Sequence, residues 1–187
     1  MLRWLQSPQA AAYHIILGGC MTIRRYLNVL TWVQVHNDVL QLTESITQSD
    51  YEPNVIVGIG YGGIIPATLL YFALPEVKFR IAYPKASNHG LIEPLSDVSG
   101  KKVLLADDLA ITGDSLMEIR DEVLREGASQ VRTACLYASA HYDGLDYCTR
   151  TLEQGELVVF PWYTEQNNTS LKVFEYKNRF GKHEPME

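Results

Sequence analysis

The sequence predicts an α/β fold, with a mostly parallel sheet flanked by helices. Short runs of valine, isoleucine and leucine alternate with longer segments in which apolar residues recur every three or four positions. Glycine, proline or asparagine lies at many of the boundaries, as expected for turns between strands and helices. Strands that alternate with helices are typical of parallel sheets. The 187 residues are of ordinary size for one domain.

The composition is that of a globular protein with a substantial core. Hydrophobic residues make up 47% of the chain and charged residues 20%. The net charge is -6 and no cluster of lysine or arginine is present, so we expect neither nucleic acid nor a membrane surface as a partner. The three cysteines lie far apart and match neither a disulfide framework nor a zinc-binding pattern, which favours a reducing cytoplasm.

The first 20 residues are expected to be a non-native or disordered extension. Their apolar part is too short and too interrupted for a signal peptide. A glycine pair at residues 18–19 lies just before Met21, as a translated ribosome-binding site would, so Met21 is a candidate natural start. A loosely ordered natural arm is the alternative. Residues 21–165 are expected to form the domain, and residues 166–187 a polar C-terminal tail.

The first predicted helix begins at Thr31 and ends before Tyr51. Thr31 and Gln34 fit a capping box. Apolar residues recur along one face at alternating steps of three and four, namely Trp32, Val35, Val39, Leu42 and Ile46.

The next elements follow the α/β order. Residues 54–60, NVIVGIG, predict a buried strand, and residues 62–74 a helix that tolerates Pro66 in its first turn. Residues 77–84 predict a partly exposed strand. Residues 85–101 have turn-forming residues and no periodicity, which indicates a long loop and a candidate lid.

The second half of the chain predicts three more strands and one helix. The strands are expected at residues 102–107, 131–138 and 156–162. The helix is expected at residues 114–128, where Gly127 would end it. Its buried face would carry Leu116, Ile119, Val123 and Leu124.

Two aspartates, Asp107 and Asp108, come at the end of the strand predicted at residues 102–107. In an open parallel sheet, ligands bind beyond the carboxyl ends of the strands. Paired carboxylates can accept hydrogen bonds from a ribose diol and can hold a hydrated Mg²⁺ ion. Solvated acids with no ligand are the alternative interpretation.

The turn ITGDS, residues 111–115, opens the following helix. Main-chain N–H groups at a helix start lack partners in the helix and favour anions. Gly113 permits a close approach of the backbone, and Thr112 and Ser115 add hydroxyl donors. A simple helix cap is the alternative. The two aspartates and this turn together predict a site for a phosphorylated ribose with Mg²⁺.

Residues 103–116, VLLADDLAITGDSL, resemble the phosphoribosyl-pyrophosphate signature of type I phosphoribosyltransferases. The similarity extends from Thr22 to Glu165. It includes VIVGIGYGGIIPATLLYFAL, which looks like the family's pyrophosphate loop, and LYASAHYDGLDYC and LVVFPWYTE, which look like purine-binding segments of xanthine- and hypoxanthine-type members. LTWVQVHNDVLQLTESI resembles the first helix of a subgroup of purine-type transferases. The resemblance implies the family's sheet with a small hood or lid region.

The resemblance also implies an activity and partners. Members transfer phosphoribose from phosphoribosyl pyrophosphate to a nucleobase, as in purine salvage, with Mg²⁺ as cofactor. Asp107 and Asp108 would be catalytic, near the ribose hydroxyls and the metal, which they would hold through water. Relatives often form dimers, so a homodimer is expected.

Further roles are carried over by position. The substrate-binding positions implied by the family are Tyr61, Gly62 and Gly63 at the pyrophosphate, Ala110, Ile111, Thr112, Gly113, Asp114 and Ser115 at the 5′-phosphate, and Phe160 or Trp162 against the base. Core filling is the alternative for both aromatic residues. On the predicted lid, Lys85 and His89 are candidates for contact with pyrophosphate, and a solvated loop is the alternative.

Three positions depart from the family pattern. Ile111 replaces an aspartate that is usual in purine-type members, and Tyr61 replaces a basic residue. Residues 137–139 lack the lysine that oxopurine enzymes use. Two hypotheses therefore remain, a transferase with altered base specificity and a non-catalytic relative that binds a nucleotide. A dinucleotide-binding fold is disfavoured because GIGYGG lacks the required glycine spacing.

Overall fold

The computed structural model describes residues 10–17, 21–85, 95–154 and 156–164. It divides into two compact units, each described here by itself. The second unit spans residues 33–154, and the first takes the described residues on either side of it.

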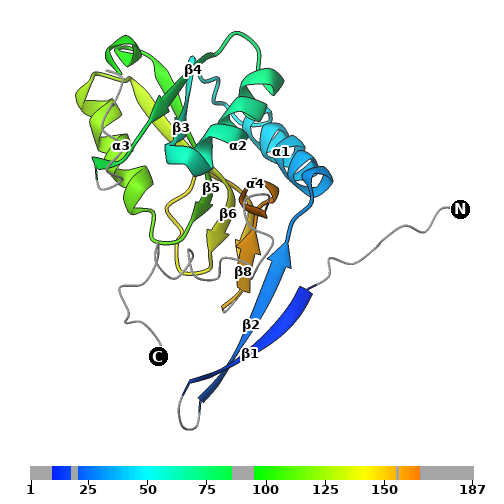
Figure 1. Cartoon of the computed structure of the whole chain (residues 1–187). Helices are drawn as coiled ribbons and strands as arrows, with labels where there is room; N and C mark the ends of the chain where they lie inside the picture. Colours follow the sequence, from blue (N-terminus) through cyan, green and yellow to red (C-terminus); the bar gives the residue numbers. More distant parts are fainter. Residues whose placement is uncertain (1–9, 18–20, 86–94, 155, 165–187) are drawn as a thin grey trace, which may run out of the picture. The chain divides into compact units, whose positions relative to one another are not determined.

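The second unit is built on a five-stranded sheet in the order β4-β3-β5-β6-β7 (Figure 1). Each neighbouring pair of strands is parallel, which confirms the predicted α/β fold. The strands are β3 (Val55–Ile59), β4 (Lys78–Ala82), β5 (Lys102–Ala110), β6 (Gln130–Ser139) and β7 (Tyr147–Leu152).

Strand β7 was not among the predicted strands. Its sequence, YCTRTL, lies at the sheet edge and buries only Tyr147 and Leu152. An edge strand with a polar middle has a weak apolar pattern, so local sequence did not distinguish it from a loop.

Three long helices pack on this sheet: α1 (Trp32–Thr47), α2 (Gly60–Ala73) and α3 (Asp114–Arg125). A short 3-10 helix, η2, spans Ser96–Val98 in the predicted loop. Helix α1 buries Val35, Val39, Leu42 and Ile46 as predicted. Trp32 is an exception, because it lies at the first residue of the helix and is 50% exposed.

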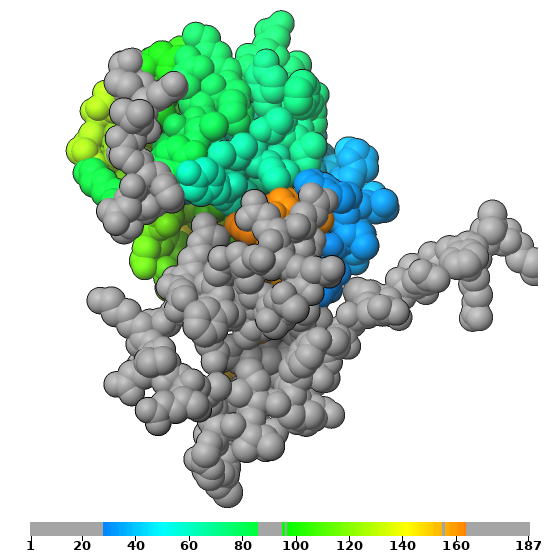
Figure 2. All heavy atoms as spheres, viewed as in Figure 1, coloured from blue at the N-terminus to red at the C-terminus, as the bar shows by residue number. Residues whose placement is uncertain are grey.

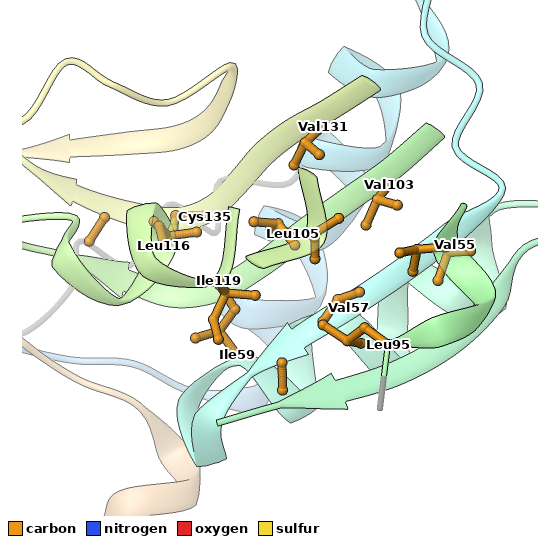
Figure 3. Close-up of a cluster of buried hydrophobic side chains, with 14 of the residues drawn as sticks. Val55, Val57, Ile59, Leu95, Val103, Leu105, Leu116, Ile119, Val131 and Cys135 are labelled. Carbon is orange, nitrogen blue, oxygen red and sulfur yellow. The ribbon is translucent and has the colours of Figure 1, made fainter. Parts of the chain in front are cut away.

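Helices α2 and α3 cover opposite faces of the sheet. Alternate residues of β3 and β5 face α3 and form one buried cluster with it (Figure 3). The cluster includes Val55, Val57, Ile59, Val103, Leu105, Leu116, Ile119 and Val123. The intervening residue Gly58 faces α2, where a side chain would meet Gly63 and Ala67.

The prediction of the buried face of α3 is wrong at one residue. Leu116, Ile119 and Val123 are buried, but Leu124 is 43% exposed. Leu124 follows Val123 directly and is therefore rotated by about 100° around the helix axis. Gly127 ends the helix region as predicted, with φ of +90°.

The outer surface of α2 carries large apolar side chains. This helix contributes to the molecular surface shown in Figure 2. Phe72 is 78% and Tyr71 39% exposed. Tyr71 contacts Phe72 and Phe79 edge-on, with ring centroids 5.4 and 6.0 Å apart. The helix is apolar on all sides although only one side faces the sheet.

The first unit contains a separate three-stranded sheet in the order β1-β2-β8. Its elements are β1 (Ala10–Leu17), β2 (Met21–Val29), β8 (Glu156–Val159) and the short helix α4 (Pro161–Thr164). β1 pairs antiparallel with β2, and β2 pairs parallel with β8. The last predicted strand thus exists, but it pairs with β2 rather than with the main sheet. Among the described residues, no helix is both long and apolar enough to cross a bilayer.

Candidate functional site

Both acidic residues lie within β5, not at its end. The predicted strand stopped at Asp107, whereas β5 continues to Ala110. β6 is long enough to pair with β5 as far as Ala110, while the pairing of β3 with β5 ends at Ala106. The acids therefore lie just beyond the carboxyl end of β3, the region where open parallel sheets bind ligands.

The N-terminus of α2 lies directly against the two acids. A Cβ atom on Gly62 would be 2.5 Å from Oδ1 of Asp108, and one on Gly63 would be 2.3 Å from the carbonyl oxygen of Ala106. Such distances exclude any side chain at either position without movement of the neighbouring atoms. The structure thus brings the predicted pyrophosphate loop and the predicted catalytic acids together.

The two carboxylates have different surroundings. Asp108 is 5% exposed and faces Gly62, whereas Asp107 is half-buried and, by the alternation of the strand, points to the other face. The main-chain N–H of Asp108 donates to Oδ1 of Asp107 at 2.9 Å. Cys135 pairs in register with Asp107. Burial, and then the charges of the two acids, raise the pKa of the Cys135 thiol, so the reactive thiolate form is disfavoured.

The turn at residues 111–115 is confirmed as the start of α3. Gly113 is the residue that precedes the helix, with φ of +77°. It has no side chain with which to cap the first turn, so main-chain donors there are not satisfied by the preceding residue. Thr112, Asp114 and Ser115 are exposed. This arrangement supports an anion at the helix start.

One predicted donor of this turn is already in use. The hydroxyl of Thr112 donates to Oδ2 of Asp114 at 2.9 Å, and the main-chain N–H of Asp114 points back to Thr112 Oγ1 at 3.4 Å. Ala110 is buried and Ile111 half-buried. Ser115 and the main-chain amides other than that of Asp114 are therefore the better-placed donors for an anion.

Tyr61 is 56% exposed at the start of α2. Its ring meets that of Tyr83 edge-on, with centroids 5.3 Å apart, so the predicted pyrophosphate loop carries an aromatic pair. Lys85 is exposed at the end of the segment after β4, and its main-chain N–H donates to Glu118 at 2.9 Å. His89 lies outside the described residues.

Residues 137–139 carry a polar contact that the sequence did not reveal. The Tyr137 hydroxyl donates to Oδ2 of Asp38 at 2.8 Å, and the Arg150 guanidinium lies 5.8 Å from the centre of the Tyr137 ring. Burial raises the pKa of both Asp38 and Tyr137. Arg150 on β7 thus brings a cation beside the position where the expected lysine is missing. Recognition of β7 as a strand would have been needed to find it.

The predicted base-stacking residues belong to the first unit. Phe160 and Trp162 stack on one another with centroids 4.6 Å apart and an interplanar angle of 12°. Trp162 also lies 5.8 Å from Trp32. Phe160 is 1% exposed and Trp162 half-buried, so Trp162 is the more accessible of the two.

Asp146 has a structural role in the loop after β6. Its Oδ2 accepts hydrogen bonds from the main-chain N–H and the hydroxyl of Thr133, at 2.8 and 3.0 Å. These contacts tie the loop to β6.

The metal-binding capacity of the site rests on Asp107 and Asp108. Among the described residues, no group of three or more histidine, cysteine or acidic side chains could hold an ion as an all-protein cage. Mg²⁺ usually keeps several waters and binds through one or two carboxylates plus substrate phosphates. One carboxylate is thus enough for a Mg²⁺ ion that arrives with a phosphorylated substrate, and Asp108, which faces Gly62, fits such an ion.

Comparison with protein families decides the identity of the fold. The model of the phosphoribosyl transferase domain matches residues 26–167. The chain belongs to this family. The match includes the Gly62–Gly63 pair, the acids of β5 and the turn before α3.

Individual relatives place this phosphoribosyltransferase-family chain with the purine type. Xanthine-guanine phosphoribosyltransferase of Gluconobacter oxydans is 29% identical over 145 residues, which cover 72% of this chain and 83% of that protein. The crystal structure of a purine phosphoribosyltransferase from Pyrococcus horikoshii has a TM-score of 0.65 and 31% identity, over 73% of this chain and 93% of the other.

A regulator is also among the relatives of this family member. Transcriptional regulator GfcR of Thermoplasma acidophilum is 24% identical over 119 residues, or 63% of this chain. The match spans 59% of the length of the regulator. The relatives of this chain thus include both named transferases and a named regulator.

Proposed function

We propose that the protein is a phosphoribosyltransferase that moves phosphoribose from Mg²⁺-bound phosphoribosyl pyrophosphate to a nucleobase. The observation that carries this proposal is the contact between Gly62 and Asp108, which joins the pyrophosphate loop to the acids of β5. The turn at Gly113 follows the same strand and offers main-chain donors for the 5′-phosphate.

Each part of the site has a role in the proposed reaction. The base nitrogen forms a bond to C1 of the ribose as the bond from C1 to pyrophosphate breaks. Positive charge develops on the ribose, and the carboxylates of Asp107 and Asp108 stabilise it. The amides of Gly62 and Gly63 bind the pyrophosphate, with Tyr61 beside them. Bound Mg²⁺ would supply charge neutralisation for the leaving pyrophosphate.

We propose that the base is not a standard 6-oxopurine. Ile111 cannot accept a proton or a hydrogen bond at the position where purine-type relatives usually have an acid. Residues 137–139 carry no lysine. Trp162 is the proposed stacking surface for the base, with Phe160 behind it, because a flat aromatic ring suits a base face.

A nucleobase panel tests this proposal. The full chain is incubated with Mg²⁺, phosphoribosyl pyrophosphate and single bases, and products are read by mass spectrometry. Release of pyrophosphate together with a matching nucleotide for at least one base is the expected result. No product with any base would contradict the transferase.

Binding can be tested separately from turnover. Asp107→Asn with Asp108→Asn should abolish the rise in Tm that Mg²⁺-phosphoribosyl pyrophosphate causes. That rise reflects about 2.7 kcal/mol at a ligand concentration of 100 Kd. Asp143→Asn, an exposed acid in the loop after β6, is the matched control and should leave the rise intact. An undiminished rise in the variant that carries both Asp107→Asn and Asp108→Asn would place the ligand elsewhere.

A second candidate function is that of a non-catalytic nucleotide sensor. The similarity to a transcriptional regulator and the departures at Tyr61 and Ile111 favour it. Saturable binding of phosphoribosyl pyrophosphate or a nucleotide, without pyrophosphate release for any base, would support the sensor. Ile111→Asp should then raise oxopurine activity in a transferase and leave a sensor without turnover.

We also propose that the protein acts in the cytoplasm as a homodimer. Neither nucleic acid nor a membrane is proposed as its partner. Sedimentation should give a mass of about twice the 21.1 kDa of one chain. A mass of one chain at micromolar concentration would contradict the dimer.

A further inference from the structure

Tyr142, in the loop between β6 and β7, is in close contact with the turn that precedes α3. A Cβ atom built on Gly113 would lie 2.2 Å from Cζ and 2.5 Å from the hydroxyl oxygen of Tyr142. The ring therefore lies against the Cα of Gly113 on the side where any other residue would carry its side chain. Gly113 is buried although the residues on both sides of it are exposed.

Other contacts of Tyr142 and of its loop also hold the ring in place. A Cβ atom on Gly144 would lie 2.8 Å from the Tyr142 hydroxyl oxygen, so a second glycine makes room for the side chain. The main-chain N–H of Tyr142 donates to Ser139 at 3.0 Å. The loop is tied to β6 by the contacts between Asp146 and Thr133. Tyr142 also packs against the buried cluster under α3.

The hydroxyl of Tyr142 contributes little to this arrangement. Its oxygen is buried and has no hydrogen-bond partner among the described residues. A buried hydroxyl without a partner destabilises a fold rather than stabilising it. The ring, and not the hydroxyl, is therefore the part of Tyr142 that the structure uses.

We propose that Tyr142 is a positioning residue, whose ring holds Gly113 in its left-handed conformation and so sets the affinity of the turn for the 5′-phosphate of the substrate. The inference rests on the proposed function, in which the amides around Gly113 bind that phosphate. Tyr142 acts on the phosphate through the turn rather than by a contact of its own. It links the β6–β7 loop mechanically to the phosphate site.

A double-mutant cycle tests the contact itself. Gly113→Ala adds a methyl group in the space of the Tyr142 ring, and Tyr142→Ala empties that space. Each single change should lower the Tm of the full chain, Gly113→Ala by at least about 4 °C. The double variant should lose clearly less than the sum, because the second change relieves the clash made by the first.

Gly100 provides a matched control for the backbone cost. It has φ of +70°, close to that of Gly113, and no described atom lies within 4 Å of its Cβ position. Gly100→Ala should therefore lower the Tm less than Gly113→Ala, and should be additive with Tyr142→Ala. Equal losses at the two glycines, or an additive cycle at Gly113, would overturn the proposal.

Ligand selectivity tests the positioning role. Tyr142→Ala should weaken the binding of ribose 5-phosphate about tenfold and leave the binding of Mg²⁺-pyrophosphate within about twofold of the wild type. Tyr142→Phe keeps the ring and should restore ribose 5-phosphate binding. Equal weakening of both ligands, or a Phe variant as weak as the Ala variant, would overturn the inference.

These measurements distinguish a failure of the proposed function from a failure of the positioning role of Tyr142. A wild-type chain that binds neither ribose 5-phosphate nor Mg²⁺-pyrophosphate would contradict the proposed function. The unfolding cycle needs no ligand, so it would still show whether the ring of Tyr142 holds Gly113.

Discussion

Gly62 and Gly63 show how single residues without side chains determine the position of a helix. At Gly63 a methyl group would meet the main-chain oxygen of Ala106 at 2.3 Å, and Ala106 lies in register with residues of both neighbouring strands. A backbone atom within a sheet cannot move aside as the end of a flexible side chain can. The close approach of α2 to the acids therefore depends on glycine at this position.

Gly63→Ala is predicted to destabilise the fold by about 2–4 kcal/mol, because the added methyl must push α2 away from β5. Urea unfolding measures the loss. Gly60→Ala is the control, since Gly60 has φ of +56° but no described atom within 4 Å of its Cβ position. Strain alone should cost about 1 kcal/mol there. Similar losses at both glycines would show that the contact with β5 is unimportant.

At the scale of elements, helix α3 illustrates the difference between an apolar pattern and a buried face. Leu116 is 1% exposed and packs in the cluster under the helix, whereas Leu124 is 43% exposed. Both leucines fit an apolar stripe in the sequence. Only the docking of the helix on β3, β5 and β6 decides which of them lies against the sheet.

Leu116→Ala is therefore predicted to cost about 2–5 kcal/mol of unfolding free energy, through lost burial and the cavity that remains. Leu124→Ala, the same change on the same helix, should stay within about 0.5 kcal/mol of the wild type. Chemical denaturation of the two variants side by side provides the measurement. A larger loss at Leu124 would contradict the described packing of α3.

The contact between α1 and β6 should make stability depend on pH. Burial raises the pKa of Asp38 above its ordinary value of 3.8, and the hydrogen bond from Tyr137 and the charge of Arg150 offset part of this rise. The native state then binds this proton more tightly than the unfolded chain. The contribution of Asp38 to the free energy of unfolding is fully present below the pKa that Asp38 has in the unfolded chain. It is lost as the pH rises through the pKa that Asp38 has in the folded state.

Asp38→Asn removes this titration, so the stability of the wild type relative to the variant should fall as the pH rises above the ordinary pKa of 3.8. Unfolding by urea at several pH values measures the difference. Asp50→Asn is a control of opposite sign, because the hydrogen bond from Arg132 lowers the pKa of Asp50. Its contribution should be lost as the pH falls. A slope of the same sign in both comparisons would refute the assignment for Asp38.

At the scale of the whole molecule, the proposed ligand contacts are unevenly distributed between the two units. The acids, the pyrophosphate loop and the phosphate turn all belong to residues 33–154, and the two proposed stacking aromatic residues belong to the first unit. The segment before Met21 contributes no proposed ligand contact.

Removal of residues 1–20 is thus predicted to leave the affinity for Mg²⁺-phosphoribosyl pyrophosphate within about twofold of that of the full chain. Calorimetric titration of both forms measures it. The same experiment on Trp162→Ala should leave phosphoribosyl pyrophosphate binding intact and weaken the binding of the nucleotide product, through lost stacking on the base. A large loss of affinity on truncation would show that the N-terminal segment supports the site.

The sequence by itself determined the α/β class, the buried stripe of α1 and the motifs at residues 61–63 and 107–115. These features are local, because apolar periodicity, glycine content and paired acids are all expressed within a few neighbouring positions. It missed β7 and the β1–β2 pair, and it ended β5 three residues early. The pairing of strands depends on partners far along the chain, which local patterns do not encode.

Only the tertiary structure decided which groups meet. The contact of Gly62 with Asp108, the ring of Tyr142 against Gly113 and the placement of Arg150 beside Tyr137 all join segments that are distant in sequence. Each depends on how strands are ordered in the sheet and on which face a helix packs, and these are set by burial over the whole unit rather than by any one segment.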